Sequence, residues 1–354
     1  MYLRGGMSVL SVALACAWPW SAAGQGLTDC GAPVSLTGKA GALSGRVFPD
    51  GTIALGAPLA VNPDGGSHSY TVGDHGFTYI ANGLNRKTAS GGWAACKTAE
   101  CRADFLKAER QAFGPGTSEF CVFAMEVEPY SSDLKRVSCG DGRSVIGNGK
   151  GKLKFGAMAE TATGERIQTY VSTTSLRHTI AGQPAYLDSE SLPVLVTPRD
   201  HPDLLGRVAL VRGAGLRDTY AVFGDTGPAF GEGSIALHQL LRYGAVSAQR
   251  PGPIAASRRC GPEEAVLPPF RSSPDVNGDV CRPGRQAQGA TDIRGYAAIQ
   301  DRIQFLILPV RFGGAASGLI PDTVNLETIA QRAAQAGYTP GQVAARLACI
   351  PRRP

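Results

Sequence analysis

Residues 191–227 read SLPVLVTPRDHPDLLGRVALVRGAGLRDTYAVFGDTG, and this stretch decides which fold is expected for the chain. It holds three short apolar runs, at 191–196, 208–211 and 220–223, separated by turns rich in Gly, Pro and Asp. Runs of this length between turn residues are typical of buried β-strands. An alternating run at 167–173 precedes them. Short strands at this spacing predict a closed or nearly closed β-barrel.

Helical patterns flank the strands. Ser234 can cap a helix over 235–241 that ends at Gly244. Further segments have helical patterns at 104–113, 326–336 and 340–347, and a strand-like pattern at 302–309. The chain also contains 46 Gly and 24 Pro, a turn-rich composition that favours β structure over helix bundles. The expected fold is mainly β with a few helices, of the α+β class, on a β-barrel core.

The N-terminus has the features of an export signal. Arg4 precedes a short apolar run at 7–17, and small residues follow at 21–23, so residues 1–23 are expected to be a signal peptide. An alternative makes Cys16 a lipid-bearing cysteine. Residues 24–66 are rich in Gly, Ala and Pro and predict a lead-in that adds little to the core, before a main domain over 67–354.

Cysteine usage agrees with export to the cell surface, the periplasm or the medium. Eight cysteines remain after Cys16, and an even number in an exported chain predicts a disulfide-stapled fold. Eight cysteines allow 105 pairings, so none is assigned, although Cys349 is expected to tie the C-terminal tail to the body. No C-x-x-C and no H-E-x-x-H spacing is present, and we expect no metal and no other cofactor.

Charge and hydropathy limit the partners. The net charge of +6 is mild, and the arginines are scattered without interleaved aromatics, which argues against a nucleic-acid partner. No run after the signal approaches twenty apolar residues, so no membrane insertion is expected. We expect a monomer.

The candidate catalytic groups are carboxylates, because no G-x-S-x-G nucleophile motif occurs. The run YLDSESLP at 186–193 carries Asp188 and Glu190. The run FGDTGPAFGEGS at 223–234 carries Asp225 at a strand end and Glu232 before a helix. Glycosidic cleavage without a metal needs such a pair: one protonated carboxyl for the leaving oxygen and one ionised carboxylate. From spacing alone, acids in Gly-rich turns are more often turn formers.

These blocks resemble the family 75 chitosanases. The resemblance covers residues 155–315 and rests on YVSTTSL at 170–176, YLDSESLP, GDTGP at 224–228 and GEGSIAL at 231–237, in the same order. It implies an endo-acting, inverting hydrolase of β-1,4 linkages in glucosamine-containing polysaccharide, with Asp225 and Glu232 as the catalytic pair. Substrate-binding roles are expected for Asp188, Glu190, Thr226 and Ser234.

The resemblance implies the pair but does not assign the acid and base roles within it. Glu232 is expected to be the acid and Asp225 the base, although the nearby helix N-terminus favours an ionised Glu232. Carboxylates at positions 188 and 190 would suit the ammonium groups of glucosamine.

Two other interpretations remain open. Asp188 with Leu192-Pro193, and the DTG at 225–227, are also similar to blocks in a three-aspartate lytic transglycosylase domain, which implies a double-psi-like barrel and a peptidoglycan substrate. There Asp225 would work with Asp188, and Glu232 would be structural. A non-catalytic carbohydrate-binding protein is the third interpretation. The carboxylate pair argues against it, as does a single tryptophan, Trp93, after the signal.

Overall fold

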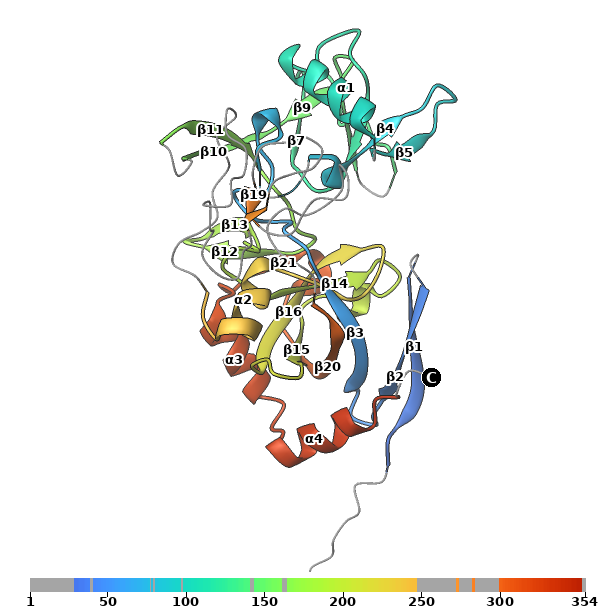
Figure 1. Ribbon diagram of the computed structural model, residues 1–354, viewed down its shortest axis with the longest axis vertical. Helices are drawn as coiled ribbons and strands as arrows, with labels where there is room; N and C mark the ends of the chain where they lie inside the picture. Colours follow the sequence, from blue (N-terminus) through green and yellow to red (C-terminus); the bar gives the residue numbers. More distant parts are fainter. Residues whose placement is uncertain are drawn as a thin grey trace, which may run out of the picture.

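The computed structural model describes residues 29–351 apart from 39–40, 77, 79, 97, 141–142, 161–163 and most of 247–298, where only two short paired strands are described. The expected signal peptide therefore lies outside the described residues, as do Cys260 and Cys281. The molecule has two parts, a barrel in the lower half of Figure 1 and a lobe above it, formed by residues 67–173.

Six strands close into a barrel. Their order around it is β3 (Ile53–Val61), β17 (Glu232–Gly233), β14 (Val194–Pro198), β16 (Thr219–Gly227), β15 (Arg207–Arg212) and β20 (Ile299–Arg311), and β20 pairs back with β3. The pairs β14–β16 and β3–β17 are parallel, whereas the other four are antiparallel. The expected mainly β fold with a barrel core is therefore confirmed.

The apolar runs of residues 191–227 became the barrel strands β14, β15 and β16, and their buried side chains fill the interior. Phe223 and Phe305 are fully buried there, and Phe230 packs edge-on against Phe305 with ring centroids 5.0 Å apart. Burial of aromatic side chains of this size contributes strongly to folding, at about 1.5–3 kcal/mol each. The barrel is thus a packed core, and a site can form only at its rim.

Two of the strand expectations need correction. The alternating run at 167–173 forms β11 (Arg166–Tyr170), which pairs with β10 outside the barrel, because its buried Tyr170 packs into the separate core of the lobe. Residues 24–66 were expected to add little core, but β3 is buried along most of its length and pairs with β20 and β17. Leu55 and Leu59 of β3 are fully buried in the barrel interior.

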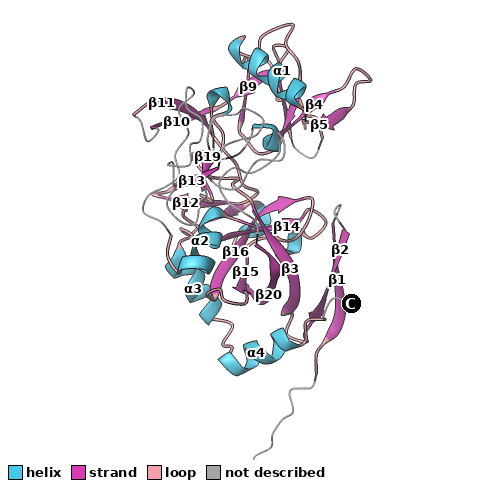
Figure 2. Cartoon of the chain, viewed as in Figure 1, coloured by secondary structure: helices cyan, strands magenta, loops and turns pink. Residues whose placement is uncertain are grey.

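The expected helices are present. Helix α2 (Ile235–Tyr243) begins at Ser234, whose Oγ accepts a hydrogen bond from the Leu237 amide at 3.1 Å, and ends at Gly244 with φ +77°. The others are α1 (Ala99–Arg110), α3 (Leu326–Ala334) and α4 (Pro340–Ala348). Helices α2, α3 and α4 lie around the barrel, and α1 belongs to the lobe (Figure 2). In the part of the chain described here, no helix is long and apolar enough to cross a membrane.

The lobe has its own core, built around Phe105 of α1 and Phe120, whose ring centroids are 5.5 Å apart. Its strands are β4 (Leu84–Lys87), β5 (Trp93–Ala95), β6 (Phe120–Val122), β7 (Val127–Pro129), β8 (Ser144–Ile146), β9 (Gly151–Leu153), β10 (Phe155–Glu160) and β11. The remaining strands, outside lobe and barrel, are β1 (Ala32–Gly38), β2 (Gly41–Val47), β12 (Arg177–Ile180), β13 (Gln183–Tyr186), β18 (Ser272–Ser273), β19 (Arg282–Pro283) and β21 (Leu319–Ile320).

Three disulfides staple the fold, which confirms that expectation for the described cysteines. They join Cys30 to Cys349, Cys96 to Cys101, and Cys121 to Cys139. The first ties the C-terminal tail to the N-terminal hairpin, as expected for Cys349. Three bridges fit a protein that matures in an oxidising compartment, outside the cytoplasm.

Candidate active site

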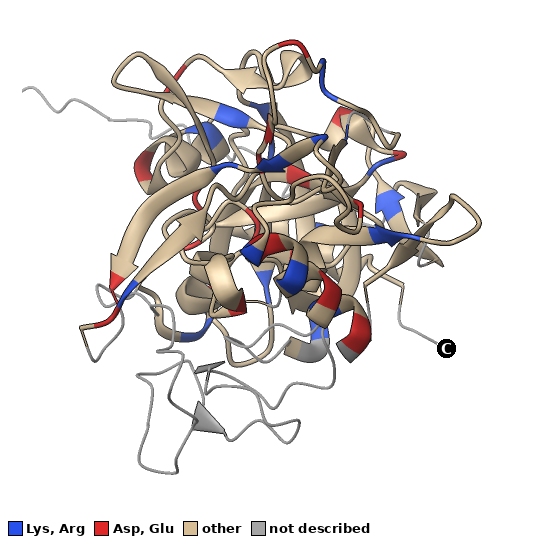
Figure 3. Cartoon of the chain, turned by 90° about the horizontal axis from the view of Figure 1, so that it is seen from above, with Lys and Arg blue, Asp and Glu red and all other residues tan. Residues whose placement is uncertain are grey.

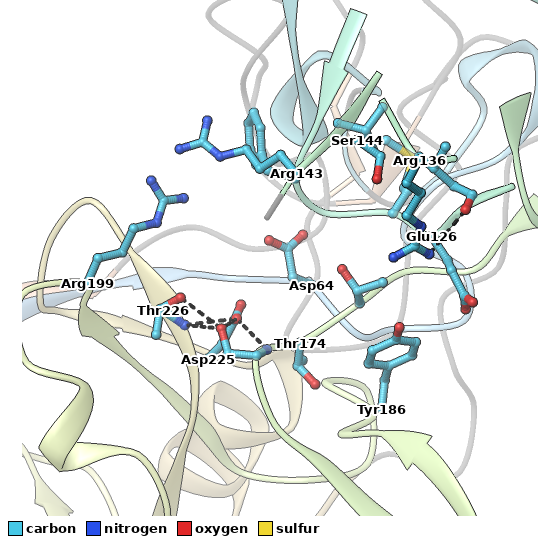
Figure 4. A pocket seen from close by; sticks show the side chains of 16 residues that line it. Asp64, Glu126, Arg136, Arg143, Ser144, Thr174, Tyr186, Arg199, Asp225 and Thr226 are labelled. Atoms are coloured by element: carbon cyan, nitrogen blue, oxygen red, sulfur yellow. Dashed lines mark hydrogen bonds between the residues drawn. The ribbon is translucent and has the colours of Figure 1, made fainter. Parts of the chain in front are cut away.

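A pocket lies between the rim of the barrel and the lobe, and Asp225 is part of its wall. The barrel side contributes Ser175, Arg199, Asp225 and Thr226. The lobe contributes Val122, Phe123, Met125, Glu126, Val127, Arg136, Arg143, Ser144 and Thr173, and the remaining lining residues are Asp64, Thr174 and Tyr186. Figure 4 shows Asp64 and Asp225 near its centre, with Arg199 and Arg143 toward one end and Tyr186 toward the other.

Asp225 is aimed into the pocket by a β-bulge. Leu195 of β14 pairs with Phe223, and the next residue of β14, Val196, pairs with Asp225, so Gly224 is an extra residue in β16. A bulge of this kind bends the strand and redirects the side chain that follows it. Gly224 is required there, since a Cβ atom would lie 2.4 Å from Leu187 Cδ1.

The Asp225 carboxyl is 8 % exposed and surrounded by donors. Its Oδ1 accepts hydrogen bonds from the Ser175 amide (2.9 Å), the Ser175 hydroxyl (2.8 Å) and the Thr226 amide (2.8 Å). Burial raises its pKa above the usual value, while these hydrogen bonds and the charge of Arg199 act in the opposite direction. These contacts therefore stabilise the ionised form of Asp225 and offset part of the effect of burial on its pKa.

Glu232 lies beside this site on the short strand β17, which is parallel to β3 and pairs Glu232 with Ala60. Its Oε2 accepts a hydrogen bond from Asn62 Nδ2 at 3.4 Å. Burial, and next the charge of Asp225, raise the pKa of Glu232 to about 7. Glu232 is not among the residues that line the pocket.

Glu232→Gln is expected to stabilise the protein at neutral and alkaline pH. The folded state holds this carboxyl protonated up to about pH 7, whereas an ordinary glutamate ionises near 4.5, so wild-type stability is lost as the pH rises between these values. The variant should match the wild type at pH 4 and exceed its free energy of unfolding by about 1–3 kcal/mol at pH 8.

Denaturant unfolding at the two pH values measures this difference, with the exposed Glu160→Gln as the matched control. An equal effect of Glu232→Gln at pH 4 and pH 8 would contradict the assigned cause.

Asp64 is a third carboxyl at the site, and sequence reasoning did not identify it. Its amide donates to Asn62 Oδ1 at 2.7 Å, and the buried Tyr70 hydroxyl donates to its Oδ1 at 2.7 Å. Burial, and next the charge of Asp225, hold the pKa of Asp64 well above its usual range. The only local signal is Asn62-Pro63-Asp64-Gly65, and such a run is typical of a turn.

The four expected substrate-binding residues have different positions. Thr226 lines the pocket, and its hydroxyl lies 2.8 Å from that of Ser175. Asp188, Glu190 and Ser234 are not among its lining residues. Asp188 accepts from the Glu190 amide (3.0 Å) and the Ser191 hydroxyl (2.7 Å), which closes the turn that they form.

Glu190 and Ser234 are both 2 % exposed and hold neighbouring segments in place. Glu190 accepts from the His68 amide and contacts His68 Nδ1, each at 2.8 Å. Ser234 donates its hydroxyl to the Leu192 carbonyl at 2.6 Å. These residues therefore position the loop after β3 and the start of α2.

Arginines and aromatic rings complete the wall of the pocket. Arg136, Arg143 and Arg199 all line it, although Lys, Arg, Asp and Glu are intermixed over the rest of the molecule (Figure 3). Phe123 is 37 % exposed, and the Arg143 guanidinium lies 5.6 Å from its ring centroid. Exposed rings and guanidinium groups suit a ligand with both apolar ring faces and polar substituents.

Within the described residues, no group of three His, Cys, Asp or Glu side chains is arranged to hold a metal ion. Comparison with known proteins adds no assignment, since no family model matches the chain and no curated protein matches it. The chemistry of the site therefore follows from its own geometry, which is a set of three carboxyls at the rim of a barrel.

Proposed function

We propose that the protein cleaves glycosidic bonds within a polysaccharide, with Asp225 at the centre of the reaction. The proposal rests on the pocket that Asp225 shares with Asp64, a carboxyl whose pKa is raised. Glu232 is a third carboxyl close to both, and its pKa is raised as well. Crowded buried carboxyls cannot all ionise, so one retains a proton at neutral pH while another is ionised. Acid and base in one site are what hydrolysis of an acetal requires.

The chemistry needs no cofactor. The ionised Asp225 accepts a proton from water as the water oxygen attacks the anomeric carbon, while a protonated carboxyl of the cluster protonates the leaving oxygen. The resemblance to family 75 chitosanases makes Glu232 the partner of Asp225, and the acid role is the one expected for it from the sequence. It also implies inversion at the anomeric carbon and cleavage of β-1,4 linkages between glucosamine units.

The pocket walls support binding of a sugar chain. Phe123 and Tyr186 contribute aromatic rings to the wall, and Ser144 and Thr226 contribute hydroxyl-bearing side chains. Because the wall is shared by barrel and lobe, a chain lying along the junction would contact both. Such a position is suited to cleavage within a polymer.

A second candidate is a lytic transglycosylase acting on peptidoglycan. The observation that favours it is the presence of three arginines in the pocket, because guanidinium groups pair with carboxylate substituents and repel the ammonium groups of chitosan. On that interpretation Asp225 works with Asp188, and Glu232 is structural.

Mass spectrometry of the products tests both candidates. The mature protein is incubated separately with chitosan and with purified peptidoglycan, and Asp225→Asn serves as the inactive control. Glucosamine oligomers with a normal reducing end support the chitosanase. Anhydro-muropeptides, with chitosan intact, support the lytic enzyme, and no cleavage of either polymer contradicts the proposed function.

A further inference from the structure

The segment after β3 brings a carboxyl into the pocket that neither family resemblance assigns. Asp64 lies two residues beyond Asn62, in a turn that follows the barrel strand, and it lines the same pocket as Asp225. Figure 4 shows its carboxyl group in the centre of the pocket, beside Asp225 and Thr226. A substrate that contacts Asp225 there also meets Asp64.

The turn that carries Asp64 is held rigidly. Gly65 has φ +90°, and a Cβ atom there would lie 2.1 Å from the Leu187 carbonyl oxygen, so the backbone packs directly against the segment that follows β13. The Gly65 amide donates to Ser172 Oγ at 2.9 Å. The buried Glu190 holds His68 on the far side of the turn. Such fixation is what a catalytic side chain needs to keep its position.

The hydrogen bonds and positions of the three carboxyls separate their roles. Asp225 Oδ1 accepts three hydrogen bonds and lies near Arg199, all of which favour the carboxylate. Asp64 lines the pocket, has a hydrogen bond from one neutral side chain, the Tyr70 hydroxyl, and has two acidic neighbours, Asp225 and Glu232, which disfavour its ionisation. Glu232 does not line the pocket; its hydrogen bond from Asn62 and the nearby N-terminus of α2 favour its ionised form and oppose the burial and the Asp225 charge that raise its pKa to about 7.

We propose that Asp64 is the catalytic residue that protonates the leaving glycosidic oxygen, and that Glu232 acts behind it as a positioning residue. This rests on the proposed glycosidic cleavage and changes which carboxyl delivers the proton. Asn62 links the two groups, since it donates to Glu232 through Nδ2 and accepts from the Asp64 amide through Oδ1. Glu232 thus helps to hold the turn, and its charge adds to the effects of burial and of Asp225, which raise the pKa of Asp64.

The step balances with water as the only co-reactant. The Asp64 O–H bond breaks and its proton goes to the glycosidic oxygen as the bond from that oxygen to the anomeric carbon breaks. A water oxygen bonds to the anomeric carbon, and its proton goes to Asp225. The products are two sugar chains, an ionised Asp64 and a protonated Asp225, and proton exchange with solvent restores the starting state.

A leaving-group comparison identifies the acid. The wild type, Asp64→Asn and Glu232→Gln are assayed on a glucosamine hexamer and on the 2,4-dinitrophenyl glycoside of a glucosamine trimer, whose phenolate leaves without protonation. Asp64→Asn should lose about 10³-fold in kcat/KM on the hexamer and less than about 10-fold on the aryl glycoside. Glu232→Gln should stay within about 10-fold of wild type on both.

The pH profile gives a second readout that a merely structural role would not produce. The alkaline limb of kcat/KM on the hexamer should move to lower pH in Glu232→Gln, because removal of a neighbouring negative charge lowers the pKa of Asp64. Circular dichroism of each variant confirms its fold. The titratable and charged groups that face Asp64 are Tyr70, Asp225 and Glu232, and Glu126, Arg136, Arg143 and Arg199 lie on the wall of the same pocket.

Each outcome decides the assignment. A leaving-group-selective loss in Glu232→Gln, and none in Asp64→Asn, overturns the role of Asp64 and leaves the proposed function intact. An equal loss on both substrates in Asp64→Asn also overturns it, since that result describes a structural residue. A wild type that cleaves neither these probes nor the two polymers overturns the proposed function itself.

Discussion

Asp225→Asn is expected to lower kcat on the cleaved glycan by about 10³-fold or more, with KM little changed. The amide is nearly the same size as the carboxyl and can still accept from the Ser175 and Thr226 amides at Oδ1. It cannot accept the proton from water, so the loss should fall on the chemical step. Binding contacts made by the rest of the pocket remain.

The matched control is Asp218→Asn, which makes the same chemical change at an exposed aspartate paired with Arg212 on the surface. An exposed pair of this kind contributes little to stability, so this variant should keep wild-type rates. Steady-state kinetics on the substrate identified by product analysis, with unfolding curves for both variants, measures the effect. Asp225→Asn with a kcat within 10-fold of wild type would remove Asp225 from the reaction.

The barrel could be predicted in part because its strands have a strong local signal. Residues 191–196, 208–211 and 220–223 are apolar runs between turn residues, and burial on the inside of a barrel demands such runs. The burial of β3 was missed because Gly56 and Pro58 interrupt its apolar pattern.

The candidate site could likewise be predicted only in part from the sequence. Asp225 and Glu232 could be singled out because they end and begin elements within one short segment. Asp64 could not, because it is more than 150 residues away and meets them only through the parallel pairing of β3 with β17. That pairing is a property of the closed barrel, and no local pattern near Asp64 predicts it.

The lobe also lay beyond what the sequence could place, since the resemblance covers only residues 155–315. Its contribution becomes clear in the pocket, where Phe123, Arg136 and Arg143 face the barrel residues. Contacts of this kind depend on how two separate cores pack together, which neither strand spacing nor composition determines. On the proposed function, the choice between a cationic and an anionic glycan would depend in part on this lobe, which the motifs do not cover.

Removal of the Cys30–Cys349 disulfide is expected to have the largest effect on stability. The bridge joins residues 319 apart and holds the tail after α4 to the start of the β1–β2 hairpin, in the half of the molecule away from the lobe (Figure 1). In the chain-entropy model a link across so long a loop contributes about 5–6 kcal/mol, by restricting the unfolded chain. The Cys30→Ala, Cys349→Ala double variant should therefore lose roughly 10 °C in Tm.

The Cys96–Cys101 bridge provides the matched control, because it joins residues only 5 apart in the lobe. Its removal by the corresponding double Ala variant should cost about 2 kcal/mol, less than half as much. Scanning calorimetry of both variants gives the comparison, and equal losses would show that loop length is not the cause. Activity well below Tm should survive loss of the long-range bridge, since β3 remains held by β20 and β17 and continues to carry Asp64 to the pocket.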